Sequence, residues 1–158
     1  MIKTTDDRIV IKVDNITKKF EDKEVIKGIT FDVYEGEIFG FLGPNGAGKT
    51  TIVKMLNGII NPTSGLISIV GIDPLSYPER IHALAGTLTE TANMYEQMTA
   101  IENLAFFSKI FGVKEKNINK RINFILNEVG LYEDRNKLVK HYSTGMRKKL
   151  SLARTLIH

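Results

Sequence analysis

The sequence predicts an α/β fold, and three observations support this prediction. The first part of the chain carries short apolar runs with the period and composition of β-strands. A glycine-rich stretch at residues 43–50 joins one of these runs to a helical pattern, and the chain from residue 99 onward has helical spacing. Hydrophobic residues make up 42% of the chain and charged residues 25%, as in an ordinary folded domain. We therefore expect a folded domain with strands first and helices later.

Four segments are predicted to be strands. Residues 9–13 alternate, residues 25–33 are rich in β-branched and aromatic side chains, and residues 37–42 form a short apolar run. A turn at residues 61–65 precedes the fourth predicted strand, at residues 66–70. The predicted strands therefore lie on both sides of the glycine-rich stretch.

Helical patterns follow the glycine-rich stretch at residues 50–56 and fill the chain from residue 99 onward. Thr99 and Glu102 have the spacing of a capping box, in which each side chain bonds the backbone of the other residue. Residues 118–129 carry apolar side chains at helical spacing. A last helix is predicted to begin near Ser143, with one apolar face made of Met146, Leu150, Ala153 and Ile157.

The glycine-rich stretch fits the pattern G-x-x-x-x-G-K-[ST], which binds nucleoside triphosphates. Its residues are Gly43, Pro44, Asn45, Gly46, Ala47, Gly48, Lys49 and Thr50. Glycines let successive N–H groups point at phosphate oxygens, and the following helix adds its positive end. Lys49 can reach the β and γ phosphates, and the Thr50 hydroxyl can bind Mg²⁺. A chance match in an unrelated turn is the alternative, but the strand before the loop and the helix after it favour a site for Mg-ATP.

A second motif lies at the start of the last helix, 94 residues after Lys49. It consists of Ser143, Thr144, Gly145 and Met146. A serine and a glycine at a helix N-terminus provide a hydroxyl and exposed backbone N–H groups, which together suit an anion. Taken alone, the motif is no more than a capped helix start, and its position behind a helical insert makes it a second landmark.

With both motifs present, the chain resembles the ATP-binding subunit, or nucleotide-binding domain, of ABC transporters. The resemblance runs from about residue 9 to the end, and residues 143–146 are similar to the family's signature motif. Thr144 and Met146 depart from the commonest Gly and Gln. This variant, the basic residues after it and residues 98–104 are similar to the subfamily that drives ABC-2-type exporters.

The resemblance implies a P-loop NTPase core with an N-terminal antiparallel β subdomain and a helical signature-motif subdomain. We expect residues 1–90 to hold the β subdomain and the P-loop half of the core, and residues 91–145 to form the helical subdomain. Residues 146–158 would begin the helix that returns to the core. The chain is expected to be truncated before the Walker B motif, so that the C-terminal part of the core is missing.

Further site roles are implied by the resemblance. Phe20 takes the place of the aromatic residue that stacks on adenine, although a phenylalanine here is equally typical of a core or strand-end residue. Thr51 would support the α-phosphate. Glu90 falls where the family usually has a glutamine that touches Mg²⁺, and a solvated surface glutamate is the alternative. Residues 143–146 would grip the γ-phosphate held by a second nucleotide-binding subunit, which implies a head-to-tail dimer.

The family's Asp-Glu pair and switch histidine would follow residue 158, so we expect no catalytic residue within this chain and do not take His158 for that histidine. Such a chain is expected to bind ATP and Mg²⁺ but to hydrolyse ATP poorly, because hydrolysis depends on positioning the attacking water. One alternative to a truncated exporter subunit is a catalytically silent nucleotide-binding module that regulates a complete partner.

The expected partner is a separate integral membrane permease, which would hold the chain at the cytoplasmic, inner face of the cell membrane. The first residues carry no apolar run of signal-peptide kind, and no later run approaches the roughly 18 apolar residues that a spanning helix needs. A soluble, non-transport ABC ATPase acting on ribosomes or DNA is another alternative. Its only support is the late basic excess, ten Lys or Arg against four Asp or Glu at residues 114–149. Only three aromatic residues, Phe124, Tyr132 and Tyr142, lie among these charges, and no nucleic acid is expected.

Overall fold

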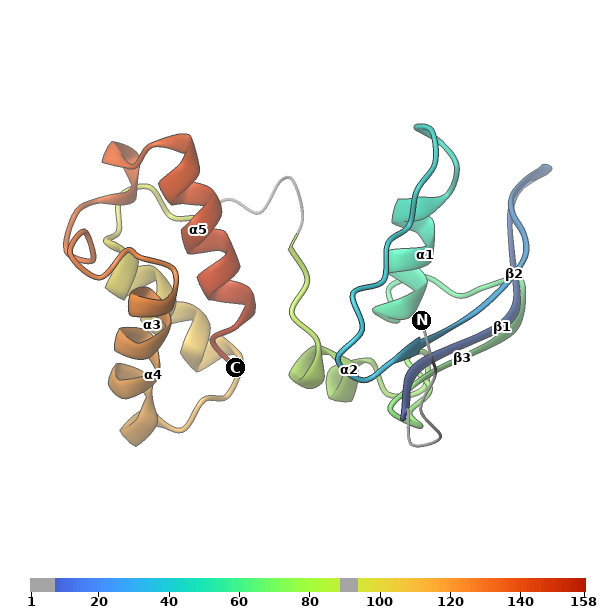
Figure 1. Ribbon diagram of the computed structural model, residues 1–158, viewed down its shortest axis with the longest axis horizontal. Helices are drawn as coiled ribbons and strands as arrows, with labels where there is room; N and C mark the ends of the chain where they lie inside the picture. Colours follow the sequence, from blue (N-terminus) through green and yellow to red (C-terminus); the bar gives the residue numbers. More distant parts are fainter. Residues whose placement is uncertain (1–7, 89–93) are drawn as a thin grey trace. The chain divides into compact units, whose positions relative to one another are not determined.

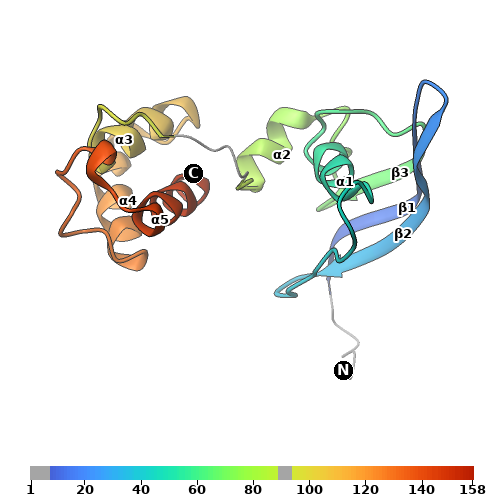
Figure 2. The same ribbon diagram turned by 90° about the horizontal axis from the view of Figure 1, so that it is seen from above.

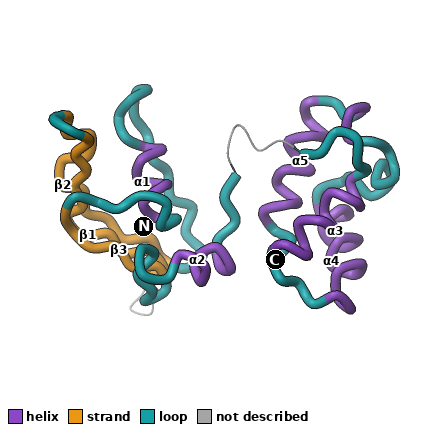
Figure 3. Tube along the Cα trace, turned by 180° about the vertical axis from the view of Figure 1, so that it is seen from behind, coloured by secondary structure: helices purple, strands orange, loops and turns teal. Residues whose placement is uncertain are grey.

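The computed structural model describes residues 8–88 and 94–158. The chain divides into two compact units, Met1–Leu84 and Ala85–His158. Among the described residues, the three strands all lie in the first unit, and the second unit is helical (Figure 3). The predicted order of strands first and helices later is therefore confirmed. The boundary lies between Leu84 and Ala85, while the subdivision at residues 90 and 145 stays a prediction.

The first unit contains an antiparallel sheet with the strand order β2-β1-β3. Its strands are β1 (Ile9–Phe20), β2 (Lys23–Tyr34) and β3 (Ser64–Ile69), which lie side by side in Figures 1 and 2. Val13 of β1 pairs with Phe31 of β2 on one side and with a residue of β3 on the other, and its side chain is fully buried. The central strand thus supplies the middle of this core.

Strand β1 is longer than the predicted segment 9–13 because its alternation breaks inside the strand. Asn15 has a positive φ of 46°, and the register of both ladders shifts next to it. The irregularity brings Val13 and Ile16, which are three residues apart, into the core together. A period-two pattern therefore stops at Val13, although hydrogen bonding continues to Phe20.

Residues 37–42 are not a strand, and this prediction was wrong. Phe39 and Phe41 pack against Phe31 of β2, with ring centroids 5.1 Å and 5.0 Å from that ring. Ile38 and Leu42 point outward and are 100% and 97% exposed. A strand needs hydrogen bonds to a neighbour as well as alternating side chains, and no strand among the described residues pairs with this segment.

Two helices complete the first unit. Helix α1 (Lys49–Leu56) follows the glycine-rich loop, lies beside the sheet in Figures 1 and 2, and buries Ile52 and Met55. Its C-terminal cap is Asn57, so the helix ends at residue 56, as the predicted range 50–56 has it. Helix α2 (Pro78–Leu84) was not predicted, because its seven residues are too few to establish a helical period.

The second unit packs three helices around one core. These are α3 (Ala100–Ile110), α4 (Glu115–Glu128) and α5 (Thr144–Thr155), with a short 3-10 helix η1 (Val139–His141) before α5. Each helix buries one apolar face, as the sequence pattern predicted. The fully buried side chains at the centre include Leu104, Leu126, Leu150, Ala153 and Ile157.

The predicted capping box at the start of α3 is present. The Thr99 hydroxyl accepts a hydrogen bond from the Glu102 backbone N–H, and the Thr99 backbone N–H donates to the Glu102 carboxylate over 2.7 Å. The bond from the Thr99 backbone N–H, and a second one from the Thr99 hydroxyl to the same carboxylate at 2.9 Å, favour the charged form and lower the pKa of Glu102. Local hydrogen bonding therefore fixes the N-terminus of α3.

Candidate nucleotide-binding site

Helix α1 starts from a glycine that no other residue could replace without strain. Gly48 is the N-cap and has a φ of 89°, in the left-handed region. A Cβ at Gly48 would lie 2.3 Å from the Cδ1 atom of the buried Ile26 and 3.3 Å from the carbonyl oxygen of Val25. The glycine therefore lets the loop approach β2 closely while turning into the helix.

The rest of the loop is open to solvent. Gly46 also has a positive φ, 83°, but a Cβ there would meet nothing within 4 Å. The five residues 43–47 are all exposed. No side chain caps α1, so its N-terminal backbone and the positive end of its dipole are available to an anion.

Lys49 holds its ammonium group over the loop. The Nζ atom donates hydrogen bonds to the carbonyl oxygens of Gly43, at 2.7 Å, and Pro44, at 2.8 Å. Thr50 is exposed and Thr51 is half-buried, both in the first turn of α1. An exposed glycine backbone, a cation and a hydroxyl thus come together at one helix end, and this donor set fits a Mg²⁺-bound triphosphate.

Two more residues, Phe20 and Glu90, were predicted to contact the nucleotide or its Mg²⁺. Phe20 ends β1 in the same unit as the loop; its side chain is 45% exposed, and the Lys18 ammonium lies 4.9 Å from the ring centroid. Phe20 is therefore not a buried core residue, and its contact with adenine stays a prediction. Glu90 lies outside the described residues.

The second motif forms the N-terminus of α5, in the second unit. Ser143 is the N-cap, and its Oγ atom accepts a hydrogen bond from the Met146 backbone N–H over 3.2 Å. Thr144 and Gly145 are exposed, and Met146 packs partly against the core. A Cβ at Gly145 would lie 3.8 Å from the Ser143 hydroxyl, which is ordinary van der Waals contact. Packing within the unit therefore does not require a glycine at this position.

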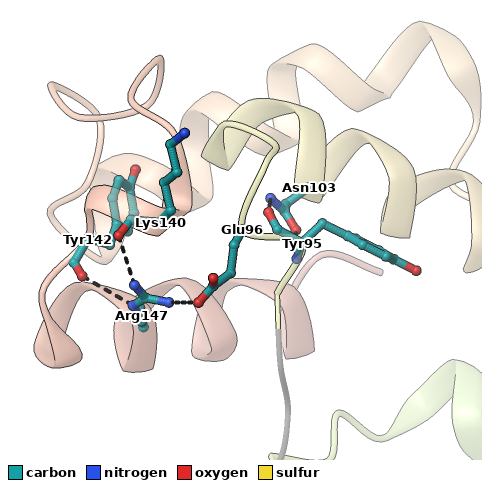
Figure 4. Close-up of polar contacts among 6 residues, drawn as sticks. All are labelled: Tyr95, Glu96, Asn103, Lys140, Tyr142 and Arg147. Carbon is teal, nitrogen blue, oxygen red and sulfur yellow. Dashed lines mark hydrogen bonds and ion pairs between the residues drawn. The ribbon is translucent and has the colours of Figure 1, made fainter.

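Sequence reasoning missed the partners of Arg147, which follows the second motif directly. Its guanidinium donates to the carbonyl oxygens of Lys140 and Tyr142 and pairs with the carboxylate of Glu96 (Figure 4). The Tyr142 hydroxyl donates to the carbonyl oxygen of Asp134; burial, with a smaller effect of the Asp134 carboxylate, raises the pKa of Tyr142. A basic residue after the motif was visible in the sequence, but a pair with a residue 51 positions away was not.

Residues 26–158 match the family model described as ABC transporter. The chain belongs to the ABC transporter family. Among its ABC relatives is the bacitracin transport ATP-binding protein BcrA of Bacillus licheniformis, 40% identical over 94% of this chain and 48% of that protein. Another relative, the ABC transporter ATP-binding protein NatA of Bacillus subtilis, is 34% identical over 94% of this chain and 63% of that protein. The linearmycin resistance ATP-binding protein LnrL, also of Bacillus subtilis, is 33% identical over 94% of this chain and 48% of that protein.

Solved ABC structures confirm the predicted P-loop NTPase fold. An ATP binding subunit of an ABC transporter has a TM-score of 0.79 and 29% identity over 92% of this chain and 60% of that chain. The protein cbiO1 from Clostridium perfringens, part of the ABC transporter complex cbiONQ, has a TM-score of 0.87 over 96% of this chain and 62% of that chain. At 23% identity, cbiO1 supports the fold alone. The chain spans about half to two thirds of the length of these ABC proteins.

Every helix in the described residues is too short or too polar to cross a membrane.

Proposed function

We propose that this chain is the nucleotide-binding part of an ABC exporter's ATP-binding subunit and that it holds Mg-ATP at residues 43–51. The observation that carries the proposal is the open glycine loop at the start of α1 with the Lys49 ammonium held over it. Backbone N–H groups at the helix end bind the phosphates, Thr50 binds Mg²⁺, and Thr51 supports the α-phosphate.

The binding energy comes from charge-assisted hydrogen bonds. Lys49 donates to two neutral carbonyl oxygens of the loop, and phosphate oxygens are stronger acceptors because they carry charge. A hydrogen bond to a charged group is worth about 1.5 to 3 kcal/mol net. Several such bonds together reach the roughly 8 kcal/mol of a micromolar ligand.

The second motif acts on a nucleotide held by another subunit in a head-to-tail dimer. Ser143 supplies a hydroxyl, and the exposed Gly145 supplies backbone that the γ-phosphate can approach closely. Within the unit, an added Cβ at Gly145 would meet only ordinary contact, so the space beside this glycine is open to a group from a second subunit. Phe20 stacks on the adenine, and its partly exposed ring is compatible with that contact.

Export through a separate membrane permease is the cellular role that we propose. BcrA is named for bacitracin transport and LnrL for linearmycin resistance, and both are more than 30% identical to this chain. The permease would keep the chain at the inner face of the cell membrane. Co-purification of the chain with a membrane permease rather than with nucleic acid would support this role.

Equilibrium binding of a fluorescent ATP analogue with Mg²⁺ to the purified chain tests the site. Lys49→Met removes the ammonium, and Lys54→Met removes an exposed lysine from the last turn of the same helix as a control. We expect Lys49→Met to raise the Kd at least about tenfold, from the loss of charged hydrogen bonds. We expect Lys54→Met to leave the Kd within about twofold, because its charge lies at the far end of α1. Absence of binding by the unaltered chain, or equal effects of the two substitutions, would sink the proposal.

A further inference from the structure

The guanidinium of Arg147 is partly exposed, but each of its nitrogens is bonded to a group of the second unit. Its Nε atom donates to the Tyr142 carbonyl oxygen at 3.1 Å, and its Nη2 atom donates to the Lys140 carbonyl oxygen at 2.9 Å. Its Nη1 atom pairs with the Glu96 carboxylate (Figure 4). Lys148, in contrast, is exposed. All three nitrogens of the guanidinium are therefore engaged within the second unit.

The groups that Arg147 joins belong to separate segments. Lys140 lies in η1, Tyr142 lies between η1 and α5, and Glu96 precedes α3. Two backbone hydrogen bonds already tie η1 to the segment around Glu96: Lys140 N–H to Glu96 O at 3.0 Å, and Val139 N–H to Met98 O at 2.9 Å. Arg147 extends this tie to α5.

The segment that carries Glu96 is anchored on α3. Asn103 is fully buried, and its side chain accepts a hydrogen bond from the Tyr95 N–H at 2.8 Å. The Asn103 amide group also donates to the carbonyl oxygens of Tyr95, at 3.0 Å, and Thr99, at 2.9 Å. Both hydrogen-bonding ends of a buried side chain are used, so the backbone next to Glu96 is held firmly against the helix.

We propose that Arg147 is a positioning residue, which sets the orientation of the first turn of α5 through its pair with Glu96. Ser143 and Arg147 are one helical turn apart, and the Arg147 N–H donates to the Ser143 carbonyl oxygen at 2.9 Å. Holding Arg147 therefore holds the Ser143 hydroxyl and the Gly145 backbone. The inference deepens the proposed function, since it assigns the residue that aims this end at the second subunit's nucleotide.

Arginine suits this role because of its shape. A guanidinium presents donors in a fixed planar fork, whereas a lysine ammonium is a single point on a flexible stem. A lysine at position 147 could keep the ion pair with Glu96 but could not also reach the carbonyl oxygens of Lys140 and Tyr142 in fixed directions. The geometry thus predicts that Arg147→Lys loosens the first turn of α5 less than Arg147→Met does.

Amide hydrogen exchange at Met146, measured by NMR on the full chain, tests the positioning directly. The Met146 N–H is bonded to the Ser143 hydroxyl, and the core amide of Ile122 serves as the reference for global stability. We expect Arg147→Met to speed exchange at Met146 about three- to tenfold, because charge-assisted bonds at a partly exposed site are lost. Exchange at Ile122 should change less, and Lys148→Met should leave Met146 unchanged.

Glu96→Gln gives a second test that keeps the side-chain shape and removes only the charge. It should speed exchange at Met146 in the same direction as Arg147→Lys, even where Arg147→Met proves too unstable to study. Equal exchange at Met146 in the unaltered chain, Glu96→Gln and Arg147→Lys would overturn the inference. A speed-up of the same size at Ile122 would overturn it as well, since the effect would then be global unfolding.

ATP-dependent self-association separates this inference from the proposed function. Sedimentation of the chain with Mg-ATP should show a dimer that Arg147→Met weakens about tenfold, while the Kd for the ATP analogue stays within about twofold. Wild-type association that Arg147→Met leaves unchanged would overturn the positioning role. If the unaltered chain does not associate, the proposed dimer fails, and the exchange measurement at Met146 alone decides on the positioning.

Discussion

The helix N-termini that carry the two sequence motifs are built in opposite ways. Helix α1 is capped by Gly48, which has no side chain, and its first turn is bare of side-chain hydrogen bonds at the cap. Helix α5 is capped by Ser143, whose hydroxyl accepts a hydrogen bond from the Met146 N–H. The first end leaves its backbone donors open to a ligand, and the second satisfies one of them itself.

The two ends also differ in what supports them. The loop before α1 depends on close packing, since Gly48 leaves no room for a Cβ beside Ile26. The first turn of α5 depends on charge, through Arg147 and Glu96. A loop that binds phosphates through its backbone needs a fixed backbone path, which packing provides. A side-chain hydroxyl such as that of Ser143 must point in a fixed direction. The ion pair between the planar guanidinium of Arg147 and the Glu96 carboxylate can fix that direction.

The largest effect is expected for Gly48→Ala. The new methyl group would clash with the buried Ile26 and would force alanine into a positive φ. We expect the free energy of unfolding to fall by about 3 kcal/mol, from backbone strain and overpacking together. Gly46→Ala is the matched control, because it has the same sign of φ but open space, and should cost only about 1 kcal/mol. Urea denaturation of both variants measures the difference; equal losses would mean that packing does not support the loop.

Ser143→Ala is expected to have a smaller effect, at the other helix end. It removes the oxygen that caps α5, and loss of such a cap costs about 1 kcal/mol. Ser143→Asn keeps a capping oxygen and should retain most of the stability. Thermal unfolding followed by far-UV circular dichroism compares the two variants. A Ser143→Asn variant as unstable as Ser143→Ala would show that the cap contributes nothing.

Gly145→Ala should change stability less than Gly48→Ala or Ser143→Ala, and in the opposite direction to both. Its φ is not positive, and its added Cβ would make ordinary contact with Ser143. Alanine in a helix is favoured over glycine by roughly 0.5 to 1 kcal/mol, so the unfolding free energy should rise by up to that amount. Urea denaturation tests this, and a clear loss of stability would mean that the glycine is needed within the unit.

The smallest effect is expected for the dependence of stability on alkaline pH, which comes from Tyr142, just before α5. Burial raises the pKa of the Tyr142 hydroxyl, so the folded chain favours the protonated form. The resulting stability is fully present below about pH 10 and is lost as the pH rises above that value toward the folded pKa. Melting temperatures between pH 9 and pH 11 should fall more steeply for the unaltered chain than for Tyr142→Phe. Parallel slopes would contradict a titrating Tyr142.

The accuracy of the sequence predictions followed the range of the interactions behind them. The capping box of Thr99 and Glu102 was predicted correctly because its hydrogen bonds join residues three positions apart. The strand at residues 37–42 was predicted wrongly because a strand needs a partner, and no local pattern supplies one. The length of β1 was underestimated because the irregularity at Asn15 interrupts the alternation without ending the strand.

By itself, the sequence determined the glycine-rich loop before a helix, the cap at Ser143 and the α/β order of the chain. These features depend on residue types at fixed short spacings, which the backbone geometry of loops and helix ends requires. Only the tertiary structure showed why Gly48 must be a glycine and that Arg147 pairs with Glu96. Both depend on side chains that are distant in the sequence and meet only when the chain folds, because packing and ion pairing act through space.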